Sequence, residues 1–525
     1  MVINNKSGEL TSGQNISYWL DTVKPQEYSR LNRDVNADVL VIGGGMAGLT
    51  TAYCLLKEGK KVVLLEDGLI GSGESGRTTA HITYALDDRY YEIEKAFGED
   101  GSRLAAESHN AAIEWIERTI AVENAESKFE RVDGFLFLHP SDKEENLVKE
   151  YEATKRAGLN TEWLREVHGI TGYTGPAIKF PRQAQFHAMM YMKMLADSII
   201  RMGGEIYTRS RANKIDRHGA ESNGYRVSAT HIVVATNTPV NDLVTMHTKQ
   251  HPYRTYVVAG KVPKGQIPHC LWWDTGDLNS KWPSDPYHYV RLVPFDETTD
   301  LLISGGEDHK TGQADDEGIP EEDRYDRLEE WTRKHFPLLG DIIYKWSGQV
   351  MEPVDYLGFI GKNPGDDNIY IITGDSGNGM THTTIGGMLV TDLILGRSNP
   401  WAEIYAPKRI PIKTPGTFLT EALNMAKQYG DWFAAGDISR AGQLANGEGA
   451  IMGQGLKKLA LYRDESSQLH AFSAVCPHLH CIVQWNADEK TFDCPCHGSR
   501  FTCMGEVING PAYKGLDRVD PPKKS

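Results

Sequence analysis

Four side chains near the end of the chain have the types and the spacing of metal ligands. They form two short boxes, Cys476-x-His478 in the stretch CPHLHC and Cys494-x-x-His497 in the stretch CPCHGSRF. Two cysteines and two histidines can hold a tetrahedral zinc ion. They can also hold a [2Fe–2S] centre, in which the cysteines bind one iron and the histidines bind the other. Each box offers one cysteine and one histidine, whereas zinc knuckles usually offer like pairs, so the pattern favours the two-iron centre.

The stretch from about 431 to 520 resembles the Rieske proteins of respiratory complexes, because both boxes match theirs. The resemblance implies a small all-β domain that holds a [2Fe–2S] cluster. The implied ligands are Cys476, His478, Cys494 and His497, and the implied disulfide joins Cys481 to Cys496. Phe501 stands where the high-potential members carry a tyrosine that hydrogen-bonds a ligand sulfur. Since that donor is missing, we predict a reduction potential below the high end of the Rieske range of about −150 to +300 mV.

A second pattern near the start of the chain is typical of a dinucleotide site. Gly43-x-Gly45-x-x-Gly48 follows the predicted strand 38–42 and opens a predicted helix. The glycines allow a tight turn, a close approach of the backbone to a pyrophosphate, and close packing of the helix on the strand. The helix N-terminus would offer its free N–H groups to the phosphates. The next strand ends at Glu66, where an acid accepts a ribose hydroxyl and favours FAD or NAD over NADP.

The chain between about 36 and 400 resembles the D-amino-acid-oxidase-like superfamily of FAD oxidoreductases, which includes glycine and sarcosine oxidases. Besides the first pattern, the resemblance rests on GSGESGRTTAHIT (71–83), THIVVATN (230–237) and IYIITGDSGNGMTHTTIGG (369–387). It implies FAD, bound by an α/β Rossmann-like domain with an interleaved α+β substrate domain built on an antiparallel sheet. The implied FAD-binding residues are Gly43, Gly45, Met46, Ala47, Gly48, Glu66, Asp67, Gly73, Arg77, Thr78, Thr79, Ala212, Ala235, Gly374, Asp375, Gly377, Asn378, Gly379, Met380 and Thr381. Some relatives attach FAD covalently; His81 and His382 are the nearby candidates, and non-covalent binding is the expectation.

The substrate side of the flavin has candidate residues but no motif. The candidates are Arg254, Tyr256, Tyr289 and Arg291, which are the residue types that bind a substrate carboxylate in the superfamily, together with His81. Aromatic residues crowd the stretch 271–292. Such residues could form a cage for a cationic amine, although one face of a sheet in the substrate domain is the simpler interpretation.

Length and composition set the organisation of the chain. A chain of 525 residues is too long for a single hydrophobic core. We expect an N-terminal arm (1–35), an oxidoreductase region (36–405), a linker (406–430) and a Rieske domain (431–525). The formal net charge of −15 argues against nucleic acid and anionic membrane as partners. The polar start and the lack of an apolar run of ~18 residues predict a cytoplasmic protein without a transmembrane segment.

These features together predict an FAD-dependent dehydrogenase that oxidises a C–N bond of a small amine or amino acid. The cluster would pass electrons one at a time to an external carrier such as a ferredoxin, a cytochrome or a quinone-linked protein, with its histidine ligands at the domain surface. Two alternatives stay open: electrons run inward from the carrier to a substrate, or the Rieske domain is a redox sensor or docking module. A mononuclear-iron oxygenase built on Asp242, His247 and His251 is disfavoured by their spacing and by the domain order.

Overall fold

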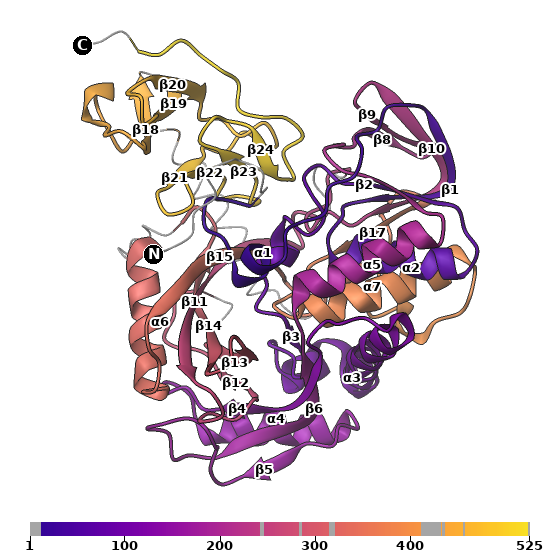
Figure 1. Cartoon of the computed structure of the whole chain (residues 1–525), viewed down its shortest axis with the longest axis vertical. Helices are drawn as coiled ribbons and strands as arrows, with labels where there is room; N and C mark the ends of the chain where they lie inside the picture. The colour runs from indigo at the N-terminus through magenta and orange to yellow at the C-terminus, as the bar shows by residue number, and fades with distance from the viewer. Residues whose placement is uncertain are drawn as a thin grey trace.

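The computed structural model describes residues 12–241, 246–282, 286–313, 321–410, 432, 436–454 and 457–522 (Figure 1). Two large sheets with their helices form the part before residue 411, and two small sheets form the C-terminal part. Strands of the two large sheets alternate along the chain, so the FAD-binding and substrate parts are interleaved, as the sequence predicts. No helix in the described ranges is both long and apolar enough to span a bilayer.

The first large sheet has a parallel core. Its strands lie in the order β16–β17–β10–β1–β2–β7, and β8 and β9 form a hairpin beside β10. Strands β17, β10, β1, β2 and β7 are parallel neighbours. Residues 39–42 of β1 are all buried, as expected for a parallel sheet covered on both faces. The strand bounds are β1 Val35–Ile42, β2 Val62–Leu65, β7 Glu205–Tyr207, β8 Asn213–Asp216, β9 Gly219–Ser222, β10 Tyr225–Val234, β16 Phe359–Lys362 and β17 Ile369–Thr373.

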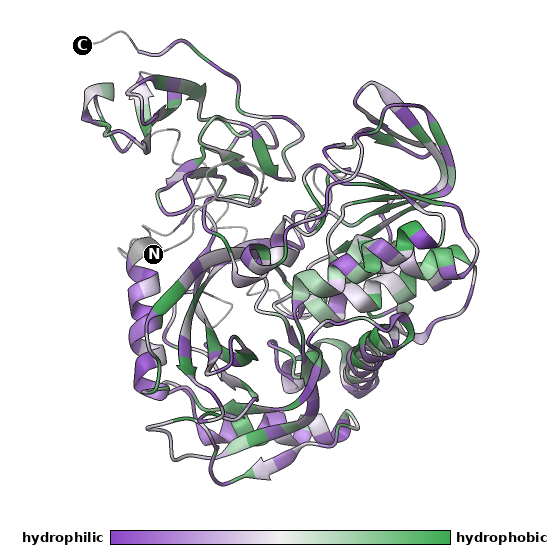
Figure 2. Ribbon diagram, in the orientation of Figure 1, coloured by the Kyte–Doolittle hydropathy of each residue, from purple (hydrophilic) through white to green (hydrophobic). Residues whose placement is uncertain are grey.

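Three helices pack beside one another on this sheet: α2 (Met46–Lys57), α5 (Ala188–Arg201) and α7 (Gly379–Ile394) (Figure 1). Figure 2 shows hydrophobic and hydrophilic residues interspersed along them, whereas α6 (Glu321–His335), which covers β11 and β14, is mostly hydrophilic. Helix α3 (Tyr90–Glu123) is broken at Gly98 and packs on α7.

The second large sheet forms the substrate part. Its strands lie in the order β15–β11–β14–β13–β12–β4–β6–β3, with β5 beside β6, and β4–β12 is a parallel pair among antiparallel ones. The aromatic stretch 271–292 supplies β12 and β13, which confirms the interpretation of that stretch as part of a sheet. Helix α4 spans Glu144–Arg156. The strand bounds are β3 His81–Ile82, β4 Glu130–Phe137, β5 Glu162–Leu164, β6 Ala177–Gln185, β11 Gln250–Pro263, β12 Leu271–Asp274, β13 Tyr289–Pro294, β14 Thr299–Lys310 and β15 Ile342–Pro353.

The C-terminal part is all-β, as predicted, with two antiparallel sheets. Strands β19 and β20 form an antiparallel hairpin before Cys476. The strand bounds are β18 Glu448–Gln454, β19 Lys457–Arg463, β20 Leu469–Ser473, β21 Gln484–Asn486, β22 Thr491–Asp493, β23 Arg500–Thr502 and β24 Val507–Asn509.

The segments predicted as an arm and a linker differ in what the structure describes of them. The first contains a short helix, α1 (Tyr18–Thr22), in which Trp19 is completely buried, so this part is packed rather than a free polar arm. In the predicted linker 406–430, residues up to 410 are described, and Arg409 forms a 2.7 Å ion pair with Asp355. The rest of that linker lies outside the described residues.

Candidate functional site

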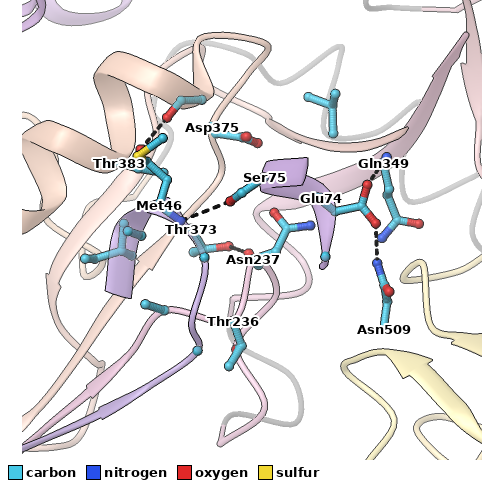
Figure 3. Close-up of a pocket in the computed structure, with 18 of the residues that line it drawn as sticks. Met46, Glu74, Ser75, Thr236, Asn237, Gln349, Thr373, Asp375, Thr383 and Asn509 are labelled. Atoms are coloured by element: carbon cyan, nitrogen blue, oxygen red, sulfur yellow. Dashed lines mark hydrogen bonds between the residues drawn. The ribbon is translucent and has the colours of Figure 1, made fainter. Parts of the chain in front are cut away.

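A cavity of about 770 Å³ lies where the two large sheets meet the C-terminal domain. All of the predicted FAD-binding residues except Gly48 and Thr381 line it. The C-terminal domain also contributes to its wall, through Ile508, Asn509, Gly510, Ala512 and Tyr513. Figure 3 shows part of this wall, where Glu74 accepts hydrogen bonds from the backbone of Gln349 and from the side chain of Asn509. The cavity is therefore shared by the two domains.

The first glycine turn has the geometry that a dinucleotide requires. Gly43 has φ 110°, and a Cβ there would lie 2.3 Å from the carbonyl oxygen of Ala235. A Cβ on Gly48 would lie 1.9 Å from the carbonyl oxygen of Gly43, so Gly48 supports the turn from the helix side. Helix α2 begins at Met46 and has no side-chain cap at Gly45. Because Gly45, Met46 and Ala47 line the cavity, the N-terminus of this helix faces it.

Glu66 has the position and the chemistry expected of a ribose-binding acid. Its carboxylate lines the cavity and accepts hydrogen bonds from the backbone N–H groups of Gly44 (2.6 Å) and Gly68 (2.7 Å). Each carboxylate oxygen keeps a further lone pair for a hydroxyl group. Burial, together with the neighbouring Asp67, holds the pKa of the Glu66 carboxyl well above its usual range. The residues around the cavity thus fit FAD.

Buried carboxyl groups surround the closing turn 374–379, and the sequence analysis missed them. A Cβ on Gly377 would lie 1.8 Å from Oδ2 of Asp87, which accepts a hydrogen bond from the Tyr287 hydroxyl. The Ser376 hydroxyl bonds both Asp88 and Glu352. Burial raises the pKa of Asp87 and of Asp88 to about 7. The only signal in the sequence was a pair of adjacent aspartates, which is common on surfaces.

The structure separates the five predicted catalytic residues into two groups. His81 and Tyr289 line the cavity, and burial lowers the pKa of His81 to about 3, so its ring is neutral. Arg254, Tyr256 and Arg291 do not line the cavity. Tyr256 stacks on another ring within the sheet, at 5.7 Å between centroids. The positions of the two arginines give no support for a carboxylate-binding role.

The four predicted cluster ligands lie together and are buried. Cys476, His478, Cys494 and His497 are each at most 6% exposed, and the two imidazole rings are perpendicular with centroids 4.8 Å apart. The disulfide between Cys481 and Cys496 is present, with Cα atoms 6.5 Å apart. The sulfur atoms of Cys481, Cys494 and Cys496 also lie within 4.8 Å of one another. Because the disulfide uses two of them, they do not form a thiolate site, and the donor set that fits a [2Fe–2S] cluster is the predicted one.

The histidine ligands were expected near the domain surface, at the exit for electrons, but His478 and His497 are only 6% and 3% exposed. They face the FAD-binding region, where the ring of His247 lies 4.9 Å from that of His478 and 6.0 Å from that of His497. In the loop of the second box, a Cβ on Gly498 would lie 2.5 Å from Cβ of Pro252. His247, considered above as an iron ligand with Asp242 and His251, therefore packs on the cluster site; Asp242 lies outside the described residues.

A buried ion pair fixes this arrangement of the domains. Glu489 of the C-terminal domain pairs with Arg77 at 2.5 Å and with Arg254 at 3.4 Å, and all three side chains are at most 1% exposed. Glu489 also accepts a 2.6 Å hydrogen bond from Ser347. Burial acts to raise the pKa of Glu489, but Arg77, Arg254, Arg500 and the hydrogen bond from Ser347 together outweigh it and lower the pKa to about 2. Arg77, predicted as an FAD contact, lines the cavity but uses its guanidinium to join the domains.

Comparisons with known proteins agree with both halves of the site. Residues 38–393 match the model of a family described as FAD dependent oxidoreductase, and residues 434–520 match that of the Rieske [2Fe-2S] domain. The chain is 29% identical over 514 residues to "Putative Rieske 2Fe-2S iron-sulfur protein YhfW" of Bacillus subtilis (strain 168), covering 96% of this chain and 97% of that one.

Two further comparisons match the FAD-binding region. The chain is 26% identical over 388 residues to gamma-glutamylputrescine oxidoreductase of Escherichia coli (strain K12), covering 70% of this chain and 86% of the relative. The crystal structure of glycine oxidase from Geobacillus kaustophilus superposes with a TM-score of 0.58 at 16% identity, over 72% of this chain and 99% of that one. At that identity the superposition shows the fold alone.

Proposed function

Since the chain belongs to the FAD-dependent oxidoreductase family and carries a Rieske [2Fe–2S] domain, we propose that it oxidises a C–N bond of a small amine or amino acid and sends the electrons through the cluster to an external carrier. In this reaction the substrate loses a hydride from carbon and a proton from nitrogen and becomes an imine, which water hydrolyses. Two one-electron acceptors are reduced and two protons are released. Bound FAD supplies two-electron chemistry and the cluster supplies one-electron chemistry.

The observation that carries the proposal is the side chain of Gln349, which joins the two cofactor sites. Gln349 lines the FAD cavity, and its Nε2 donates a 3.2 Å hydrogen bond to the carbonyl oxygen of Gly498. Gly498 follows His497, a proposed cluster ligand, directly in the chain. Because the histidine ligands face the FAD-binding region, this arrangement favours electron exchange between FAD and the cluster within one molecule.

The substrate class is supported by the name of one relative. Gamma-glutamylputrescine oxidoreductase is named for a substrate with amine nitrogen, and it matches this chain over most of the FAD-binding region. The carrier is proposed by chemical class only, as a one-electron protein carrier such as a ferredoxin, a cytochrome or a quinone-linked protein. We propose a cytoplasmic location from the sequence.

An anaerobic mixing experiment tests the direction of electron flow. Amines, N-methyl amino acids and D- and L-amino acids are mixed with the holoenzyme while flavin absorbance and the cluster's paramagnetic resonance signal are recorded. We expect a substrate to bleach the flavin first and to reduce the cluster afterwards. If no candidate bleaches the flavin and only a chemically reduced carrier does so, electrons run inward and the proposal is wrong.

A ligand substitution tests whether turnover depends on the cluster. We expect His497→Ala to keep flavin reduction by substrate but to abolish turnover with a one-electron acceptor. His480→Ala is the matched control, because His480 is an exposed histidine on the loop of the first box and is outside the proposed ligand set. Acceptor-linked turnover that survives in His497→Ala would support the sensor or docking alternative instead.

A further inference from the structure

The part of the cavity next to strands β12 and β13 of the substrate sheet, called the substrate end below, combines aromatic rings with carboxylates. Three aromatic side chains line it: Trp273 on β12, Tyr289 on β13, and Tyr287 just before β13. The centroids of the two tyrosine rings are 5.4 Å apart. Asp87 and Asp308 line the cavity beside these rings. Asp87 accepts a hydrogen bond from the Tyr287 hydroxyl, and Thr255, which bonds Tyr289, also bonds Asp308. The Tyr289 hydroxyl is held in place by a 2.6 Å hydrogen bond with Thr255. The electron-rich faces of such rings attract cations.

The two arginines that could have bound a substrate carboxylate are occupied elsewhere. Arg291 donates to the carbonyl oxygens of Thr79 (3.0 Å), Ala80 (2.6 Å) and Phe186 (3.2 Å). Arg254 donates to Ser347 and pairs with Glu489 at the domain interface. Both guanidinium groups are fully buried away from the cavity. Neither is available to a bound molecule.

The cationic side chains that do line the cavity, among the described residues, are also paired. They are Arg77, Arg211 and Lys214, and their ion-pair partners are Glu489, Asp67 and Glu221, at 2.5–2.7 Å. Asp67 is one of the predicted FAD contacts, so its ion pair with Arg211 lies where FAD is predicted to bind rather than at the substrate end. A carboxylate at the substrate end would thus meet two acids and, among the described residues that line the cavity, no cation. The cationic groups that act on these two acids, Arg89 on Asp87 and His288 on Asp308, do not line it.

A bulge in the sheet directs Asp308 into the cavity. The register of β11 with β14 shifts between Arg254 and Tyr256, and opposite this shift Glu307 has φ 59°. Bulges of this kind re-aim a side chain. The Oδ1 atom of Asp308 is buried and has no hydrogen-bond partner among the described residues. An unpartnered carboxylate oxygen in a cavity is a ready acceptor for an ammonium group.

We propose that this end of the cavity binds the ammonium group of an amine that has no α-carboxylate, with Asp308 and Asp87 as its counter-ions and the rings of Trp273, Tyr287 and Tyr289 around it. This inference deepens and rests on the proposed function, because it narrows the substrate from amines and amino acids to amine cations. The narrower substrate class follows from the charged side chains that line the cavity: carboxyl groups lie at this end, and the cationic side chains among the described residues are paired elsewhere.

Binding of three non-substrate probes to the FAD-loaded enzyme tests the inference by calorimetry. The probes are choline, its uncharged carbon analogue 3,3-dimethylbutanol, and betaine, in which a carboxylate replaces the hydroxymethyl group of choline. We expect choline to bind about tenfold or more tightly than either of the others. Tighter binding of betaine than of choline, or equal binding of choline and dimethylbutanol, would overturn the inference.

Substitutions of the two acids test whether their carboxylates account for the binding of choline. We expect Asp308→Asn and, as a second variant in case the first fails to fold, Asp87→Asn to weaken choline binding about tenfold. Glu307→Gln is the matched control, because its carboxylate faces Arg327 at 2.8 Å rather than the cavity. Equal choline affinity in Asp308→Asn and the unaltered enzyme would contradict the inference.

The two proposals fail in different ways. If choline binds as expected but no amine bleaches the flavin, the proposed function is wrong and the cation site stands. If amino acids bleach the flavin and betaine outcompetes choline, the proposed function stands and the cation site is wrong.

Discussion

At the scale of single residues, Phe501 lies where one hydroxyl group would change the chemistry of the cluster. It is completely buried on β23, opposite Phe492 on β22. We expect Phe501→Tyr to raise the reduction potential, because a hydrogen bond to a ligand sulfur stabilises the reduced, more negative cluster. A bond worth about 1.5 kcal/mol corresponds to roughly 60 mV in a one-electron couple.

Potentiometric titration of the cluster signal measures this shift. Phe492→Tyr adds the same hydroxyl to the neighbouring strand and should leave the potential unchanged. Equal potentials for Phe501→Tyr and the unaltered protein would mean that the hydroxyl does not reach a ligand sulfur.

Residue patterns predicted the parts of the site that depend on the local chain. Gly43, Gly45 and the two cluster boxes act through turns that their own neighbours define, so short stretches were enough. Glu489 could not be found in this way, because an acid in a polar turn looks solvent-exposed until domain docking buries it against Arg77. Asp308 was missed for a related reason, since its direction depends on a bulge formed with a distant strand.

At the scale of elements, the turn between β17 and α7 holds the flavin end of the cavity in shape. Gly377 has φ 69°, and its missing side chain leaves room for the buried Asp87. We expect Gly377→Ala to lose most of the bound FAD, because a Cβ there combines a left-handed backbone with a direct clash. The measurement is the ratio of flavin absorbance to protein in the purified variant.

Gly396, at the other end of α7, is a matched control for this substitution. It also has φ 69°, but a Cβ there would meet no atom within 4 Å. We expect Gly396→Ala to cost about 1 kcal/mol of stability from backbone strain and to keep its FAD. Loss of FAD from both variants would show that strain, rather than contact with Asp87, controls the turn.

The sequence predicted helices and strands more reliably than the contacts between them. The strand–turn–helix unit at the start of the FAD-binding region carries a strong local pattern, and it is present as β1 and α2. The burial of α1 was missed, because its three large apolar residues, Tyr18, Trp19 and Leu20, are few within a polar segment. Contacts that join distant segments, such as His247 on His478, leave no periodic signal.

At the scale of the whole molecule, Glu489 determines how firmly the C-terminal domain is attached. Glu489→Gln leaves Arg77 and Arg254 buried without a full counter-charge, which costs about 3–5 kcal/mol. We expect a lower unfolding temperature and faster proteolytic release of the C-terminal domain. Glu506→Gln, an exposed acid of the same domain, should change neither.

The same carboxylate gives a pH dependence with a definite sign. Its folded pKa of about 2 lies below the ordinary value of 4.5. The stability it contributes is therefore complete above about pH 4.5 and is lost as the pH falls toward 2. As the pH falls between these values, the difference in stability between Glu489→Gln and the unaltered protein should shrink. A constant difference in stability across that range would rule out this role of Glu489.

Electrons that pass between FAD and the cluster must cross the cavity wall that the two domains share. We expect them to cross it through a defined contact. Gln349 and Gln313 both donate 3.2 Å hydrogen bonds to carbonyl groups of the second cluster box, at Gly498 and Pro495, but only Gln349 lines the FAD cavity. We expect Gln349→Leu to slow cluster reduction by about tenfold, equivalent to about 1.4 kcal/mol of barrier, while flavin bleaching by substrate keeps its rate. Gln313→Leu should leave both rates unchanged, because it breaks a contact of the same interface away from the flavin. Anaerobic stopped-flow with separate flavin and cluster signals resolves the two steps. Equal slowing in both variants would mean that docking alone, and no particular side chain, sets the rate of transfer.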